Sequence, residues 1–298
     1  MNQDIKQQAI IGPTASGKSD LAIKIAQETN SYILSIDSLS IYKEIDIVSA
    51  KPSSDELKTI KHFGINEIYP NEHFSVDIFI NLYKKVMQQC KEDDKNLIIV
   101  GGTSFYLKSL TDGLSAIPII TDDIDSIVND KLEDLEECYS FLNSIDAKYM
   151  QKIASNDKYR IQKAMLIYEA SSLAPSQWFS QNPPQPIIKN LPIFNIAISR
   201  DILRKRIQRR TSKMLDMGLI DEVCYLEQKY SREPNSMGAI GIVEVLQYLD
   251  GKVTQEKMLE NISIHTAQLA KRQQTFNTHQ FKSIVSAPLE ELEKIILT

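Results

Sequence analysis

The chain has 298 residues, of which 42% are hydrophobic and 24% charged, and its net charge is −5 at pH 7. This is the composition of a globular protein with one large domain or two small ones. No stretch approaches the ~20 apolar residues that cross a membrane. The opening residues, MNQDIKQQAI, carry no basic segment followed by a long apolar run, so we expect a cytoplasmic protein without a signal peptide.

The segment Gly12–Ser19, GPTASGKS, fits the phosphate-loop pattern G-x-x-x-x-G-K-[ST]. Apolar Ala9–Ile11 precede it, and Leu21 begins a helical pattern after it. In this context, successive backbone N–H groups and the positive end of a helix point at phosphate oxygens. Lys18 would reach the terminal phosphates, and Ser19 would ligate Mg²⁺.

Strand and helix signals alternate through the first third of the chain. Strands are expected at Ala9–Ile11, Ser31–Ile36 and Leu97–Val100, with helices between them. Short apolar runs separated by helices predict an α/β fold, a P-loop NTPase-like parallel sheet flanked by helices. Ligands of such sheets bind at the carboxyl ends of the strands, so the loops that begin at Asp37 and Gly101 become candidate site segments.

The middle of the chain has a different texture. An acidic stretch, 122–137, is followed by helical patterns over Tyr139–Ile153 and Tyr159–Ala170, and then by a proline-rich return. We expect a helical insertion domain, 118–192, within a core formed by 1–117 and 193–298. The sheet should resume at Phe194–Ile198. The remainder reads as helical and includes the expected helices Ile202–Met217, Ser236–Leu249 and Gln255–Phe276.

Charged, cysteine and histidine residues complete the candidates. Arg206, Arg210 and Lys213 lie at i, i+4 and i+7 and share one helical face, which is either a binding face or a solvated one. The three cysteines, Cys90, Cys138 and Cys224, lie far apart and indicate reduced thiols rather than disulfides or zinc. The histidines form no metal-binding spacing, and we assign no role to His62, His73, His265 or His279.

Seven blocks in order resemble the bacterial tRNA dimethylallyltransferases, also called tRNA isopentenyltransferases. The first three are GPTASGKS, SIDSLSIYKEIDIVSAKPS from Ser35 and VGGTSFYLKSLTDGLS from Val100. The others begin at Asn156 (NDKYRIQKA), Leu203, Ala239 (AIG) and Leu269 (LAKRQ). The likeness covers nearly the whole chain.

This resemblance implies transfer of a dimethylallyl group from dimethylallyl diphosphate to N6 of the adenosine on the 3′ side of a tRNA anticodon. The catalytic residues would be Asp37, Thr103 and Arg206, with Asp37 accepting the proton of the attacking amine. The diphosphate-binding residues would be Gly12, Thr14, Ala15, Ser16, Gly17, Lys18 and Ser19, with Mg²⁺ on Ser19. The insertion domain would contact the anticodon arm of the tRNA, and we expect a monomer.

The resemblance also implies a set of tRNA-binding residues. These would be Asp37, Ser38, Leu39, Ser40, Tyr159, Arg160, Ile161, Gln162, Lys163, Arg210, Lys271 and Arg272. Four positions are less basic than the family's pattern, namely Asp125, Val243, Ala267 and Thr278. They leave the catalytic residues intact and affect the expected contacts with tRNA phosphates.

Three other functions share parts of this pattern. A small-molecule kinase would use the phosphate loop but would leave the Asp37 and Gly101 segments without a purpose. A prenyltransferase acting on AMP or ADP would not need the insertion or the Tyr159–Lys163 segment. A non-catalytic RNA-binding ATPase would bind RNA without prenyl transfer.

Overall fold

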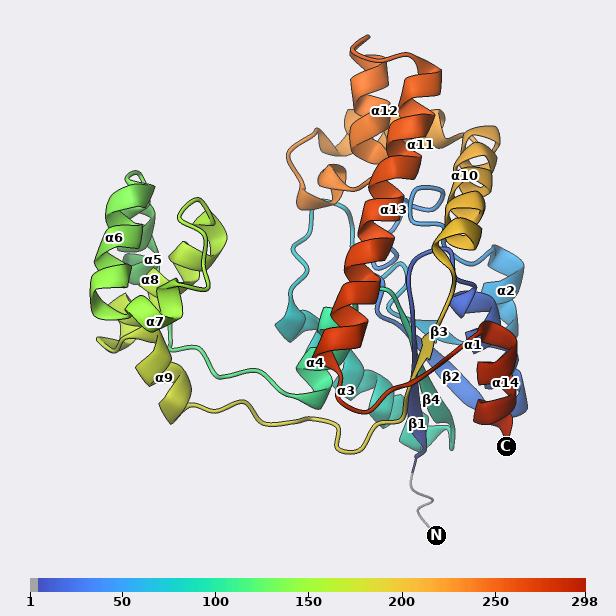
Figure 1. The fold of residues 1–298 in the computed structure, drawn as a ribbon, viewed down its shortest axis with the longest axis horizontal. Helices are drawn as coiled ribbons and strands as arrows, with labels where there is room; N and C mark the ends of the chain where they lie inside the picture. The colour runs from blue at the N-terminus through green and yellow to red at the C-terminus, as the bar shows by residue number, and fades with distance from the viewer. Residues whose placement is uncertain (1–4) are drawn as a thin grey trace. The chain divides into compact units, whose positions relative to one another are not determined.

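The computed structural model describes residues 5–298 and separates them into two compact units (Figure 1). The core unit is formed by the residues up to Thr111 and by Ile188–Thr298, and the insertion unit is Asp112–Ile187. The core unit contains β1 (Gln7–Ile11), α1 (Lys18–Glu28), β2 (Ser31–Ser35), α2 (Ser54–Thr59), β3 (His62–Phe63), α3 (Val76–Glu92), β4 (Asn96–Gly101), α4 (Ser104–Thr111), β5 (Ile193–Ile196), α10 (Arg200–Asp216), α11 (Leu219–Tyr230), η1 (Asn235–Gly238), α12 (Ile242–Leu249), α13 (Gln255–Gln280), β6 (Val285–Ala287) and α14 (Leu289–Leu297).

A six-stranded, wholly parallel sheet with the order β3-β2-β4-β1-β5-β6 forms the centre of the core unit. Its central strands are apolar on both faces, which is why Ala9–Ile11 and Leu97–Ile99 are fully buried. The sheet confirms the predicted α/β fold. Because β2, β4 and β1 are neighbours, the loops that follow them meet at one edge of the sheet.

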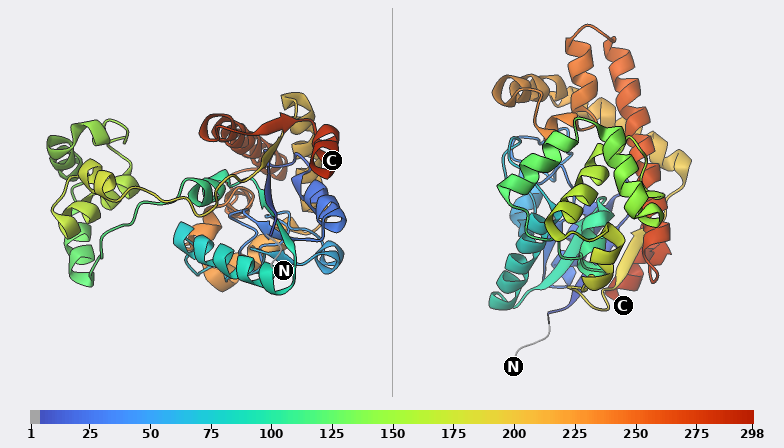
Figure 2. Two further views of the ribbon diagram at one scale, coloured as in Figure 1. Left: turned by 90° about the horizontal axis from the view of Figure 1, so that it is seen from below. Right: turned by 90° about the vertical axis from the view of Figure 1, so that its left-hand side faces the viewer.

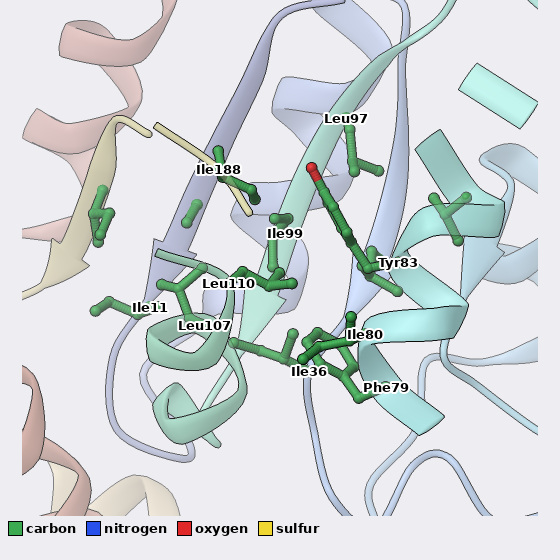
Figure 3. Close-up of a cluster of buried hydrophobic side chains, with 14 of the residues drawn as sticks. Ile11, Ile36, Phe79, Ile80, Tyr83, Leu97, Ile99, Leu107, Leu110 and Ile188 are labelled. Atoms are coloured by element: carbon green, nitrogen blue, oxygen red, sulfur yellow. The ribbon is translucent and has the colours of Figure 1, made fainter. Parts of the chain in front are cut away.

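Helices cover both faces of this sheet. On one face α1 and α14 pack on Ile10, Ile33 and Ile98. On the other face α3 and α4 supply Phe79, Tyr83, Leu107 and Leu110, which surround Ile11 and Ile99 (Figure 3). These contacts hold the strands, and therefore the loops at their carboxyl ends, in a fixed frame.

A separate apolar cluster joins α10, α11, α12 and α13 to the loop that follows β2. From this loop Ile41 and Ile45 are buried against Leu219, Val223 and Ile262 of the helices. Glu222 fastens the same loop, because its carboxylate accepts hydrogen bonds from the backbone N–H groups of Asp46, Ile47 and Val48 at 2.8–2.9 Å. Apolar packing and hydrogen bonds to the backbone thus both hold this loop in place.

The structure corrects several predicted elements. The expected helix Ser236–Leu249 is divided into η1 and α12, with Gly241 at φ +101° between them. The pattern over Tyr139–Ile153 is divided at Asp146, whose side chain accepts the N–H of Tyr149 and begins a new helix. The short strands β3 and β6 were not predicted, because two- and three-residue strands carry no periodic signal.

The insertion unit is a bundle of five helices, drawn in green to olive-yellow in Figures 1 and 2. They are α5 (Asp122–Lys131), α6 (Leu135–Ile145), α7 (Ala147–Met150), α8 (Lys158–Ser171) and α9 (Pro175–Gln181). Its core is formed by Val128, Leu142, Met150, Ile161 and Met165. Trp178 donates its indole N–H to the Ala116 carbonyl at 2.7 Å, so the return segment is anchored inside this unit.

Across residues 5–298, no helix combines the length and the apolar character that a membrane span requires.

Replacing Glu222 with alanine should destabilise the protein by about 1–3 kcal/mol, because three backbone N–H groups lose a charged acceptor. The free energy of unfolding in urea measures this effect. Asp221→Ala is the matched control, since Asp221 is the exposed neighbour on the same helix. Equal stability of the two variants would show that the Glu222 carboxylate does not hold the loop.

Candidate active site

The phosphate loop runs from the end of β1 to the first turn of α1. Gly17, the residue before α1, has φ +94°, and a Cβ there would lie 2.7 Å from Leu289 Cδ1. Ala15 has φ +63°, a conformation that residues with side chains rarely adopt. Strain of this kind persists where the surrounding structure imposes it and is common at binding sites. The loop is therefore shaped for its backbone groups rather than for its side chains.

Lys18 is the buried cation of this loop. Its Nζ donates a hydrogen bond to the Pro13 carbonyl at 2.7 Å. Burial lowers the pKa of Lys18 to about 8, the positive charge of Arg210 adds to that effect, and the negative charge of Asp37 opposes it. Lys18, Asp37 and Arg210 therefore form one interacting group of charges.

Helix α10 places two arginines on the phosphate loop. Arg206 Nη1 donates to the Ser16 carbonyl at 2.9 Å, and Arg210 Nη2 donates to Thr14 Oγ1 at 3.0 Å. Burial lowers the pKa of Arg210, opposed by Asp37. The i, i+4 spacing thus brings both guanidinium groups to the loop, and each keeps further N–H donors for an anion.

The members of the loop have different surroundings. Ala15, Gly17, Lys18 and Ser19 line a cavity of about 300 Å³, together with Asp37, Ser40 and Arg210. Gly12 lies beneath the loop, where a Cβ would meet Ile196 and Ser16 at 3.2 Å. Ser16 is buried, and its Oγ has no hydrogen-bond partner within residues 5–298. Ser16 therefore does not line the phosphate cavity, and its backbone N–H and carbonyl bond to Pro13 and Arg206.

A second cavity, of about 420 Å³, adjoins the first. Its lining mixes polar and apolar side chains, and the apolar part is formed by residues such as Leu39, Met214, Ile240 and Leu269, for which we call it the apolar cavity. Asp37, Ser49 and Arg210 line both cavities. A ligand with a charged head and a short apolar chain would therefore place the junction of its two parts at Asp37.

Asp37 follows β2 directly and is held in a turn. Its Oδ1 accepts the N–H groups of Leu39 at 2.9 Å and Ser40 at 3.3 Å. Its Oδ2 has no hydrogen-bond partner in the described part of the chain. Thr103, which follows the adjacent β4, accepts the N–H of Ser38 at 3.2 Å and lines the apolar cavity beside Asp37. The sheet thus brings together the carboxylate and the hydroxyl that the sequence predicts.

Gln273 is a site residue to which the sequence analysis assigned no role. Its Oε1 accepts the backbone N–H of Thr14 at 2.7 Å, and it lines the apolar cavity. Gly102 permits this approach, since a Cβ there would lie 2.3 Å from Gln273 Nε2. The only signal was its place in the LAKRQ block.

The predicted RNA-contacting segment of the insertion unit begins α8. Asp157 caps this helix by accepting the N–H of Arg160 at 3.1 Å. Tyr159 is 68% exposed, and Lys163 Nζ lies 5.6 Å from the centre of its ring. Gln162 donates to Asn129 Oδ1 at 3.1 Å. Ile161 is fully buried in the unit's core, so its side chain packs rather than faces solvent.

Lys271 and Arg272 are exposed on α13, and Ser38 is exposed beside Asp37. These positions belong to the core unit and leave their side chains available to a large ligand. Within residues 5–298, no group of three or more histidine, cysteine, aspartate or glutamate residues is arranged to hold a metal. Ser19 is exposed at the start of α1 and lines the phosphate cavity with Asp20 and Asp37. Oxygen ligands of this kind suit Mg²⁺ that is bound mainly through phosphate and water.

Comparisons with known proteins agree with this geometry. A family described as IPP transferase matches residues 40–280. The chain is 66% identical, over 98% of each chain, to a Sulfurimonas denitrificans protein named tRNA dimethylallyltransferase. It also resembles the crystal structure of a tRNA isopentenylpyrophosphate transferase from Bacillus halodurans, with a TM-score of 0.72, 27% identity, and coverage of 99% of this chain and 95% of that one.

A eukaryotic dimethylallyltransferase, described as acting on tRNA, is similar with a TM-score of 0.83 and 25% identity. The similarity covers 95% of this chain and 74% of the eukaryotic one. The family match and the two similar structures all point to the same family of proteins. The chain belongs to the IPP transferase family.

Proposed function

We propose that this protein transfers a dimethylallyl group from dimethylallyl diphosphate to N6 of the adenosine on the 3′ side of a tRNA anticodon. The position of Asp37 carries the proposal. This carboxylate lies where the polar cavity beside the phosphate loop meets the apolar cavity. Dimethylallyl diphosphate likewise has a polar and an apolar part, a diphosphate joined to a five-carbon chain. Its reacting carbon is the one bonded to the diphosphate oxygen.

The reaction exchanges one bond at that carbon. The bond from C1 of the dimethylallyl group to the diphosphate oxygen breaks, and its electron pair leaves with the diphosphate. Lys18, Arg206 and Arg210 stabilise the charge that grows there, as fixed cations aimed at a developing anion do. Mg²⁺ near Ser19 would add Lewis-acid stabilisation of the leaving group.

N6 of the adenosine supplies the electrons of the new C–N bond and must lose a proton. Asp37 keeps Oδ1 in its turn and has Oδ2 for this proton. Thr103 lies beside Asp37. Its hydroxyl oxygen accepts a hydrogen bond from the backbone N–H of Ser38, and its O–H can donate a hydrogen bond to the adenine. A donor and an adenine bound against the apolar side chains of the second cavity would displace water, which would otherwise compete with N6 for the allylic carbon.

The insertion unit supplies the features of an RNA contact surface. Tyr159 offers an exposed ring for stacking, and Arg160 and Lys163 offer charges for phosphates. An adenosine within a tRNA loop has to leave its stack to reach a carboxylate that lines a cavity. We therefore propose that the insertion unit binds the anticodon arm. Lys271 and Arg272 of the core unit would make further contacts with the same RNA.

The first test is the reaction itself. Purified protein with Mg²⁺, labelled dimethylallyl diphosphate and unmodified tRNA should form isopentenyl-adenosine, detected by mass after digestion to nucleosides. AMP and ATP are offered in parallel and should stay unmodified, and chelation of Mg²⁺ should lower the rate. Product on AMP would assign the protein to free nucleotides, and phosphate transfer from ATP to a small acceptor would identify a kinase.

Asp37→Asn should lower kcat by ~10²–10⁴ and leave the KM for the donor nearly unchanged. Asparagine keeps a carbonyl oxygen for the N–H groups of Leu39 and Ser40, so the turn is retained while the base is lost. Single-turnover rates with saturating tRNA measure the effect. An unchanged rate would remove Asp37 from the mechanism.

Arg206→Ala should weaken binding of inorganic diphosphate about 10–100-fold, because it removes a charged donor beside the loop. Isothermal titration calorimetry with Mg²⁺ present provides the measurement. Arg209→Ala is the control, since Arg209 is an exposed arginine on the same helix. Equal affinities of these two variants would exclude Arg206 from the diphosphate site.

A further inference from the structure

His62 lies on the edge strand β3 and lines the phosphate cavity. It is paired in parallel register with Ile33 of β2, and paired residues point to the same face of a sheet. Ile33 is buried beneath α1. His62 therefore faces the side of the sheet on which the first turn of α1 carries Lys18 and Ser19, and all three residues line one cavity.

The two ring nitrogens of His62 have different surroundings. Nδ1 lies 2.7 Å from the Ile60 carbonyl oxygen. A carbonyl can only accept, so Nδ1 carries the hydrogen of the neutral ring, and Nε2 carries the lone pair. Nε2 has no hydrogen-bond partner within residues 5–298. Protonation of the ring would therefore create one new donor, at Nε2.

Such a donor would favour an anion in this cavity, because the charged side chains that line it balance in number. The cations that line it are Lys18, Lys51 and Arg210, and the acids that line it are Asp20, Asp37 and Glu56. Lys51 is already committed to the protein, since its Nζ donates to Tyr42 O, Asp46 Oδ1 and Asn66 Oδ1 at 2.6–2.7 Å. An ammonium has three donors, so none is left for a ligand.

We propose that His62 is a further diphosphate-binding residue, which takes up a proton from solvent as the diphosphate enters and donates a hydrogen bond from Nε2 to one of its oxygens. This inference rests on the proposed function. It adds His62 of β3 to the diphosphate-binding residues of the phosphate loop. The N–H···O⁻ bond forms with the anion and is lost when the product diphosphate leaves.

The electrostatic surroundings set the direction of this exchange. Burial lowers the pKa of His62, opposed by the bond to Ile60 and by Glu56 of α2. Glu56 is itself held ionised, because hydrogen bonds from Ser53 and the positive charge of Lys213 on α10 lower its pKa. Lys18 and Asp20 of α1 line the same cavity as His62. The free protein therefore holds His62 neutral near pH 7, and an arriving anion raises its pKa. Because binding takes up a proton, the affinity for diphosphate falls as the pH rises through the pKa of the complex.

The protein contains four histidines, so the ring resonances of the ¹⁵N-labelled full chain can be resolved. The pH titration of each ring is followed with and without inorganic diphosphate and Mg²⁺, and His62→Gln identifies the resonance of His62. We expect the midpoint of His62 to rise by about one pH unit or more with diphosphate. The midpoint of the exposed His73 should not move.

Calorimetry in two buffers of different ionisation enthalpy counts the protons taken up near pH 7. The wild type should take up a larger fraction of a proton than His62→Gln, and the variant should bind diphosphate about tenfold more weakly. His73→Gln is the matched control and should behave as the wild type. Unchanged affinity and proton uptake in His62→Gln would overturn the inference while leaving the proposed function in place.

A wild type that binds no diphosphate would instead count against the proposed function itself. Should His62→Gln not fold, variants of His73, His265 and His279 assign the remaining resonance to His62 by elimination. A midpoint that stays fixed when diphosphate is added to the wild type would then overturn the inference.

Discussion

The hydrogen bonds from α10 and α13 to the phosphate loop are the contacts on which the site depends. Arg206 and Arg210 bind its Ser16 carbonyl and Thr14 hydroxyl, and Gln273 accepts the Thr14 N–H. These bonds join the first strand–loop–helix unit to helices near the other end of the chain. Arg210 and Gln273 also line the apolar cavity, so the same two side chains join the phosphate loop to that cavity.

This arrangement places cations where there is little water to stabilise them. Lys18 is buried and Arg210 is half-buried, and desolvation lowers the pKa of both, while Asp37 opposes the shift. A diphosphate would reverse this balance, because it supplies the counter-charge that these cations lack. We therefore expect part of the affinity for a diphosphate to come from relief of this unfavourable charge.

Local patterns made the frame of this protein predictable. The strand before Gly12, the helix after Lys18 and the parallel sheet all follow from short apolar runs and helical periodicity, and the structure confirms the sheet. The position of Asp37 and Thr103 at adjacent strand ends also follows from that frame, while their chemical roles stay predictions. Strands β3 and β6 were missed because so few residues carry no pattern, and their pairing depends on neighbouring strands.

Contacts between distant residues were beyond reach of the sequence. Gln273 and Thr14 lie 259 positions apart, and Glu222 lies more than 170 positions from the loop that it holds. The Tyr159–Lys163 segment shows another limit. A resemblance marks the segment as a whole, whereas the helix turns Ile161 inward and Tyr159 outward. His62 was set aside because its neighbours in the chain offered no ligand spacing, and its cavity is formed by other strands and helices.

The insertion unit leaves and re-enters the core at adjoining points. The N–H of Ile188 bonds to the Leu110 carbonyl at 2.9 Å, so the two ends of the excursion are already neighbours in the core. The core sheet runs on across this junction without using any residue of the insertion. In evolutionary terms the unit is a module on a closed scaffold. Its length and surface can diverge while the sheet and the phosphate loop stay under separate selection.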